Sequence, residues 1–141
     1  MNALIESSAL VKMLLIEPGH EKARAAWEVA ERTVASSIAY PETRAAIAAA
    51  ARDGRINDAG HGEAFRELER RWRHAVVVPV TEDVARLAGD LAEEQGLRGC
   101  DAIHLATAAI IADPHLLLVT WDPQLSAAAE RLGIATEPRF E

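Results

Sequence analysis

The chain has 141 residues, half of them hydrophobic, which is typical of one domain with a single buried core. Its formal net charge of −7 argues against a general nucleic-acid-binding protein, which usually has a basic face, but is compatible with acids that hold metal ions. The single cysteine, Cys100, excludes an intramolecular disulfide and argues against a cysteine-based zinc site.

The start of the chain, MNALIESSAL, has no basic region followed by a long apolar stretch, so we expect no signal peptide. No apolar run reaches the roughly 18 residues that a membrane span requires. We therefore expect a cytoplasmic protein with no membrane partner.

The first predicted elements are a strand, two helices and a second strand. Residues 2–5 are a short apolar run, and a helix at 8–16 follows it and ends at a Pro-Gly pair. Residues 20–31 place three alanines and a tryptophan on one face of a second helix. The stretch TVASS at 33–37 is predicted to be a second short strand.

The middle of the chain predicts three helices and one strand. Residues 41–52 form an alanine-rich helix that opens with proline, which is tolerated in a first turn. Residues 59–73 form a charged helix with apolar side chains three and four positions apart. AVVVPV, at 75–80, is β-branched and predicts a buried strand, and a helix at 82–95 begins after a threonine cap.

The last third of the chain repeats the alternation of helix and strand. A helix is predicted at 100–112, a strand at 115–120, a helix at 123–132 and an edge strand at 134–136. Short apolar strands joined by helices imply a parallel sheet with both faces covered. We see no linker or internal repeat, so we expect one domain over residues 1–141.

Four acids lie where predicted strands end or where the next helices begin. Glu6 ends the first apolar run, and Asp122 follows the strand LLLVT. Glu42 lies in the first turn of the helix after TVASS, and Asp101 opens the helix CDAIHLATA. Because ligands of open parallel sheets bind beyond the carboxyl ends of the strands, we expect these acids to lie at one edge.

Crowded carboxylates repel one another, and a dication relieves that repulsion. Mg²⁺ and Mn²⁺ prefer oxygen ligands, and such an ion lowers the pKa of a bound water and neutralises charge on a phosphodiester. The sequence therefore predicts a divalent metal site for hydrolysis, formed by Glu6, Glu42, Asp101 and Asp122.

Each acid also has a simpler structural interpretation. Glu42 and Asp101 lie at helix starts, where the helix dipole favours an acid, and Asp122 before a proline is a common N-cap. Glu6 is open to the interpretation that it faces solvent. Four acids at matching positions favour the site interpretation over four separate ones.

Three further polar residues are candidates for supporting roles. Thr120 lies just before Asp122, His104 lies one turn into the helix that Asp101 opens, and Ser8 follows the first acid. The simpler alternatives are a helix cap for Ser8 and a packed core residue for His104. The sequence lacks the motifs GxxxxGK[ST], GxGxxG and GxSxG, so ATP hydrolysis, dinucleotide binding and serine hydrolase chemistry lack their signatures.

Four blocks, in order, resemble the PIN-domain family and, within it, the VapC-like toxins of bacterial type II toxin–antitoxin pairs. They are IESSALVKMLLIEPG, YPETRAAIAAA, GCDAIHLATA and LLVTWDPQLSAAAERLG. The resemblance implies a three-layer α/β/α sandwich with a short central parallel sheet. It also implies a Mg²⁺- or Mn²⁺-dependent endoribonuclease toxin that cleaves structured RNA, is blocked by a small cognate antitoxin and forms a homodimer. The family's acids map to Glu6, Glu42, Asp101 and Asp122, with Ser8 and Thr120 as polar support.

One departure from the family pattern is the first acid, which is usually aspartate and here is Glu6. The additional methylene leaves three outcomes open: a tolerated variant, weaker catalysis or a different metal preference. The alternative function is a catalytically weakened domain that acts mainly by binding antitoxin or RNA. A phosphoryl-accepting signalling domain would require a lysine after a late strand. The two lysines, Lys12 and Lys22, lie early in the chain, so the sequence argues against this function.

We expect RNA contacts from basic residues: Lys12, Arg44, Arg52, Arg55 and Arg98.

Overall fold

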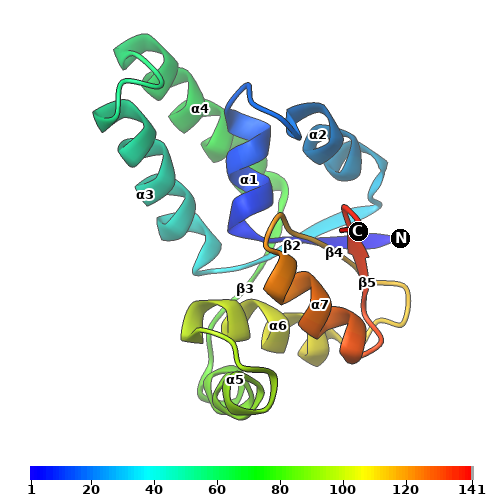
Figure 1. The fold of residues 1–141 in the computed structure, drawn as a ribbon. Coiled ribbons are helices and arrows are strands. Elements are labelled where there is room, and N and C mark those ends of the chain that lie inside the picture. Colours follow the sequence, from blue (N-terminus) through cyan, green and yellow to red (C-terminus); the bar gives the residue numbers. More distant parts are fainter. Residues whose placement is uncertain (141) are drawn as a thin grey trace.

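Five parallel strands form the centre of the molecule, in the order β3-β2-β1-β4-β5 (Figure 1). The structure is a computed structural model that describes residues 1–140; Glu141, the last residue of the predicted domain, lies outside the described part. The strands are β1 (Asn2–Ile5), β2 (Arg32–Ser36), β3 (Val76–Val78), β4 (Leu117–Val119) and β5 (Ala135–Glu137).

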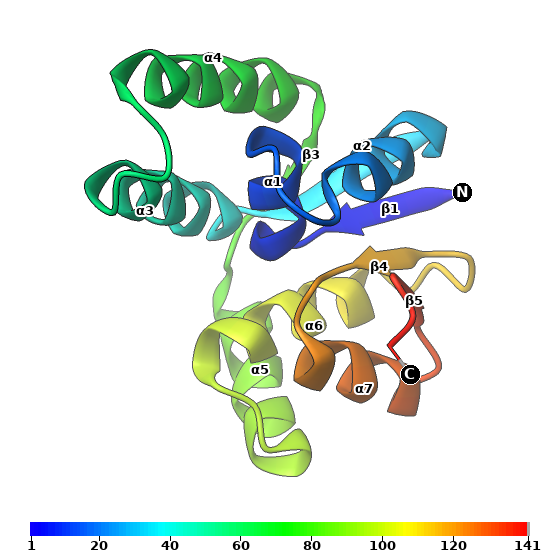
Figure 2. The same cartoon turned by 45° about the horizontal axis from the view of Figure 1, so that its top comes forward.

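Helices cover both faces of this sheet, as Figure 2 shows. One layer contains α1 (Ser7–Leu14), α2 (His20–Val29), α3 (Ala39–Arg52) and α4 (Asp58–His74). The other layer contains α5 (Glu82–Gln95), α6 (Gly99–Ile111) and α7 (Pro123–Arg131). The predicted three-layer α/β/α sandwich around a short parallel sheet is therefore confirmed.

The core consists of three apolar clusters, and the two larger ones lie on opposite sides of the sheet. Leu4 of β1 joins Leu105 and Leu125 in the layer of α5, α6 and α7, whereas its neighbour Ile5 joins Leu10 in the layer of α1 and α2. This alternation follows from the two-residue period of a strand. The many small alanines among these clusters allow the helices to approach the sheet closely.

The strand predicted at 75–80 is shorter and more exposed than expected. It is reduced to β3, in which Val76 is 48% and Val77 is 37% exposed, so the prediction of a buried strand is wrong. The reason is its place at the edge of the sheet, where it pairs with β2 alone. Pro79 follows directly and has no backbone N–H to continue the ladder. The other predicted elements are confirmed, with their ends displaced by at most two residues.

The parallel arrangement brings the carboxyl ends of all five strands to one edge of the sheet. Ile5 of β1 pairs with Val119 of β4, and the backbone N–H of Glu6 donates to the carbonyl oxygen of Val119 over 3.1 Å. The residues that follow β1 and β4 are therefore neighbours, although more than a hundred positions separate them. Within residues 1–140, the structure has no helix whose length and apolar character would let it cross a bilayer.

Candidate active site

Glu6 is a buried carboxylate at the start of α1, with 4% of its surface exposed. Its side chain caps the helix by accepting a hydrogen bond from the backbone N–H of Ser8 over 3.1 Å. The hydroxyl of Ser7 donates to Oε1 over 2.7 Å, and the hydroxyl of Thr120 donates to Oε2 over 2.8 Å. The interpretation of Glu6 as solvent-facing is therefore wrong. The cap of α1 is Glu6, whereas a serine was the predicted cap.

Ser8 and Thr120 connect Glu6 to the loop that carries Asp122. The hydroxyl of Ser8 donates to Glu6 and accepts a hydrogen bond from the backbone N–H of Trp121 over 2.8 Å. The hydroxyl of Thr120 likewise accepts from the backbone N–H of Asp122 over 3.1 Å. A hydroxyl donates one hydrogen and accepts with its lone pairs, so each of these two hydroxyls can donate to Glu6 and accept from the backbone at the same time. These contacts fix the loop between β4 and α7 against the start of α1.

Asp122 is the N-cap of α7, as the structural interpretation of its sequence predicted. Its Oδ1 accepts from the backbone N–H of Gln124 over 2.9 Å, and Pro123 occupies the first turn. A cap of this kind stabilises a helix by about 1 kcal/mol. Within residues 1–140, hydrogen bonds from the chain reach one oxygen of this carboxylate and leave Oδ2 available. Capping and ligand binding are therefore compatible at Asp122.

Asp101 lies in the first turn of α6 and is 6% exposed. The guanidinium of Arg98 donates from Nε to Oδ2 of Asp101 over 3.0 Å. This hydrogen bond, the charge of Asp101 and the nearby charge of Asp122 raise the pKa of Arg98. Arg98 therefore supplies a positive charge beside the acids, although its side chain is 83% exposed to solvent. Within the described residues, Oδ1 of Asp101 accepts no hydrogen bond from the chain.

Glu42, in the first turn of α3, lies against His104 of α6. The two side chains approach to 2.7 Å between Nε2 and Oε1, and the same Nε2 is 3.9 Å from Oε1 of Glu6. Burial raises the pKa of Glu42, but the hydrogen bond and charge of His104, with contributions from Ser7 and Arg98, outweigh burial and lower it. Glu42 is therefore ionised at neutral pH.

The structure thus brings the four predicted acids to one edge of the sheet, and their supporting residues with them. His104 contacts Glu42 and approaches Glu6, while Arg98 contacts Asp101. Glu6, Glu42 and Asp122 follow the carboxyl ends of β1, β2 and β4, whereas Asp101 follows α5 and lies in the first turn of α6.

Most of the predicted RNA-contacting residues lie elsewhere. Lys12 is in the last turn of α1 and forms an ion pair with Glu17 over 3.1 Å. The guanidinium of Arg44 lies over the ring of Phe65, 4.7 Å from its centre. Of these residues Arg98 lies beside the acids, and RNA contact by any of them stays a prediction. Arg52 ends α3, and Arg55 follows in the turn before α4.

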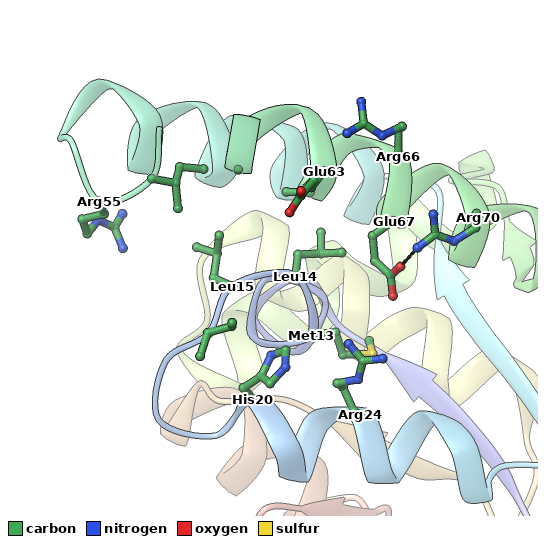
Figure 3. Close-up of a pocket in the computed structure, with 14 residues that line it drawn as sticks. Met13, Leu14, Leu15, His20, Arg24, Arg55, Glu63, Arg66, Glu67 and Arg70 are labelled. Carbon is green, nitrogen blue, oxygen red and sulfur yellow. Dashed lines mark hydrogen bonds and ion pairs between the residues drawn. The ribbon is translucent and has the colours of Figure 1, made fainter. Parts of the chain in front are cut away.

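A cavity of about 530 Å³ lies at the opposite end of α1 from Glu6 (Figure 3). Its walls are the last residues of α1, the beginning of α2 and one face of α4. None of the four acids, all within residues 1–140, lines it. The cavity is therefore separate from the acid edge. The charged residues that line it are Arg24, Arg55, Glu63, Arg66, Glu67 and Arg70.

The donor set at the acid edge fits a hard divalent cation by its chemistry. In the described part of the chain, no three His, Cys, Asp or Glu side chains are grouped as ready ligands of one ion. Mg²⁺ does not require such a group, because it keeps several waters and binds through one or two carboxylates and substrate phosphates. The available oxygens of Asp101 and Asp122, with the ionised Glu42, are oxygen donors of the type that such an ion prefers.

Sequence reasoning missed the contacts that Ser7 makes in the site. Ser7 donates to Glu6 and also lowers the pKa of Glu42. His104 was expected near the site, since residues three apart on a helix share a face and Asp101 precedes it by three, and its burial agrees with the alternative of a packed core residue. No comparable signal exists for Ser7, whose contact depends on how α3 packs beside α1.

Comparisons with known proteins agree with this architecture. The family model of the PIN domain matches residues 3–131. Ribonuclease VapC45 of Mycobacterium tuberculosis (strain CDC 1551 / Oshkosh) is 39% identical over 133 residues, which cover 94% of this chain and 92% of that protein.

Two solved structures share the fold at low sequence identity. PAE2754 from Pyrobaculum aerophilum has a TM-score of 0.72 at 22% identity and covers 96% of this chain and 92% of its own. A toxin–antitoxin complex from Klebsiella pneumoniae has a TM-score of 0.66 at 22% identity, with coverage of 89% and 90%. The family match over most of the chain, together with this fold, shows that the protein belongs to the PIN domain family.

Proposed function

We propose that this chain is a single-domain, metal-dependent endoribonuclease toxin that cleaves RNA phosphodiester bonds. The observation that carries the proposal is the convergence of Glu6, Glu42, Asp101 and Asp122 at one sheet edge, with Ser8, Thr120 and His104 bonded to them. Its relative at 39% identity is named a ribonuclease, which supports RNA as the substrate.

We assign the acids different roles from their hydrogen bonds. Asp101, Asp122 and Glu42 are placed to hold Mg²⁺ or Mn²⁺, because they have oxygens available or are ionised at the edge. Both oxygens of Glu6 already accept hydrogen bonds, so we assign it to ordering the hydroxyls of the site and adding negative charge. The bound ion would supply a water of lowered pKa and neutralise charge on the phosphodiester.

Arg98 is the basic residue best placed to contact the RNA backbone. Its side chain is 83% exposed and stands beside Asp101, where the phosphate next to the ion would lie. A guanidinium matches two oxygens of a phosphate at once. The surrounding acids hold it at this position in the absence of RNA.

Removal and return of the metal test the proposal directly. We expect the purified chain to cleave a structured RNA such as a tRNA when Mn²⁺ or Mg²⁺ is present. EDTA should abolish the cleavage, and excess Mn²⁺ should restore it, because the carboxylates alone supply no activated water. Cleavage that persists in EDTA contradicts the metal dependence, and no cleavage of any RNA with either ion contradicts the ribonuclease assignment.

The change Glu6→Asp tests the alternative of a weakened domain. Aspartate remains a good N-cap, but its carboxylate is drawn back by one carbon–carbon bond, about 1.5 Å, and loses its contact with Thr120 or Ser7. We therefore expect cleavage to be unchanged or lower, and the free energy of unfolding in urea to fall by about 1 kcal/mol. A gain in cleavage of about tenfold or more, equivalent to 1.4 kcal/mol in the barrier, would instead support the weakened domain.

We also propose a small antitoxin as the protein partner and a homodimer as the assembly. The fold shared with a protein of a toxin–antitoxin complex supports the first of these. Co-purification with the product of a small neighbouring gene, together with loss of RNA cleavage, tests the antitoxin. The mass of the purified chain in solution, measured by light scattering, tests the dimer.

A further inference from the structure

His104 is the buried side chain that joins the two helical layers at the acid edge. It comes from α6, whereas Glu42 comes from α3 on the other side of the sheet (Figure 2). The imidazole has no exposed surface. Its Nε2 is 2.7 Å from Oε1 of Glu42 and 3.9 Å from Oε1 of Glu6.

The polar contacts of this ring set its hydrogen-bonding role. Only carboxylate oxygens face Nε2 among the described residues, and an ionised carboxylate accepts but does not donate, so Nε2 carries a hydrogen. Nδ1 is buried and has no hydrogen-bond partner within residues 1–140. A buried polar side chain that leaves one of its atoms unpaired incurs a cost. The bond to Glu42 is therefore the polar contact that orients the ring.

The same contact restrains Glu42. Its side chain is 30% exposed to solvent, and the Glu6 carboxyl lies 3.9 Å from the same Nε2 that contacts Glu42. Repulsion between like charges favours a rotamer that turns Glu42 outward. The hydrogen bond from Nε2 opposes that rotation and fixes Oε1, which restricts the positions that the remaining oxygen can take.

We propose that His104 is a positioning residue, which holds Glu42 at the acid edge through the Nε2–Oε1 hydrogen bond and so sets the affinity of this edge for a divalent ion. The inference rests on the proposed function for the identity of the ion, but its test does not depend on RNA cleavage. It assigns His104 no contact with substrate and no transfer of a proton.

Three substitutions separate the donor from the bulk of the ring. In His104→Gln the amide nitrogen occupies the place of Nε2, in His104→Asn it occupies the place of Nδ1, and His104→Leu has no donor. We expect Mn²⁺ affinity, measured by calorimetry, to stay within about threefold of the wild type for His104→Gln. For the other two variants we expect the dissociation constant to rise about 10- to 100-fold, the usual cost of losing a residue that orients a metal ligand.

Thermal unfolding followed by circular dichroism shows whether each variant is folded. A folded His104→Asn or His104→Leu with wild-type Mn²⁺ affinity would overturn the proposal, and so would a folded His104→Gln as weak as His104→Leu. If the variants do not fold, nitrogen-15 NMR of the histidine rings of the wild type and of Glu42→Ala decides. A hydrogen on Nε2 of the buried ring, with signals that shift in Glu42→Ala, supports the role, and a hydrogen on Nδ1 alone overturns it.

RNA cleavage measured on the same samples separates the two proposals. If Mn²⁺ affinity follows the expected order but the wild type cleaves no RNA, the ribonuclease proposal fails and the positioning role stands. If the wild type cleaves RNA and the affinity does not follow that order, the positioning role alone fails.

Discussion

Replacing Asp101 with asparagine is expected to reduce metal-dependent RNA cleavage by about 100-fold or more. The amide has the same size as the carboxylate, so the first turn of α6 is expected to keep its packing. It lacks the negative charge that a divalent ion requires of its ligand, and Asp101 has an oxygen available for that contact. Initial rates of cleavage at a fixed Mn²⁺ concentration measure the loss.

The matched control is Asp90→Asn, which removes the same charge from an exposed position on α5. We expect this variant to cleave RNA at the rate of the wild type. If Asp101→Asn cleaves as fast as Asp90→Asn, the assignment of Asp101 to the site is wrong. Raising the Mn²⁺ concentration offers a second check, because a weakened metal site is partly restored by more metal whereas a misfolded chain is not.

Replacing Gly19 with alanine is expected to lower the free energy of unfolding by about 2–4 kcal/mol. Gly19 has a φ of +97°, which side chains of L-residues rarely adopt, and it precedes α2. An added Cβ would lie 2.8 Å from Nε1 and 3.0 Å from Cε2 of the Trp121 indole, which is too close for either atom. The strain of the backbone and the displacement of the ring therefore both lower the free energy of unfolding. Urea denaturation of both proteins measures the difference.

Gly54→Ala is the matched control for this prediction. Gly54 also has a positive φ, +74°, but no atom lies within 4 Å of the added Cβ. We expect it to lose about 1 kcal/mol, from the backbone conformation alone. Equal losses in the two variants would mean that the contact with Trp121 contributes nothing. Because Trp121 stands between Thr120 and Asp122, Gly19→Ala is also expected to slow RNA cleavage, which Gly54→Ala is not.

The fold was predictable from the sequence because its signals are local. Short apolar strands separated by helical patterns imply a covered parallel sheet, whereas the predicted stop at Pro18 and Gly19 is late, because α1 already ends at Leu14. The exposure of β3 was not predictable, because its residues read as apolar whether the strand lies at the centre or the edge of the sheet. Only the pairing order shows that β3 has one neighbour.

The candidate site was predictable in its residue types but not in its contacts. The strand ends indicate where acids gather, yet the hydrogen bond from Thr120 to Glu6 spans 114 positions and depends on the pairing of β1 with β4. The sequence also does not show which groups an arginine side chain contacts. Arg44 and Arg98 were both proposed as RNA contacts from their charge, and only the structure shows that Arg44 stacks on Phe65 whereas Arg98 lies beside Asp101.

The pairing of β1 with β4 has a consequence for the time at which the site is assembled. A chain is synthesised from its N-terminus, so Glu6 emerges early, whereas β4 begins at Leu117 and Thr120 and Asp122 follow it. Until β4 and the residues that follow it leave the ribosome, β1 lacks one of its two neighbouring strands and the carboxylates do not lie at one edge. For the ribonuclease proposed above, the nascent chain therefore has no complete site until the residues after β4 have been translated, while it is still close to the ribosomal RNA and the messenger RNA.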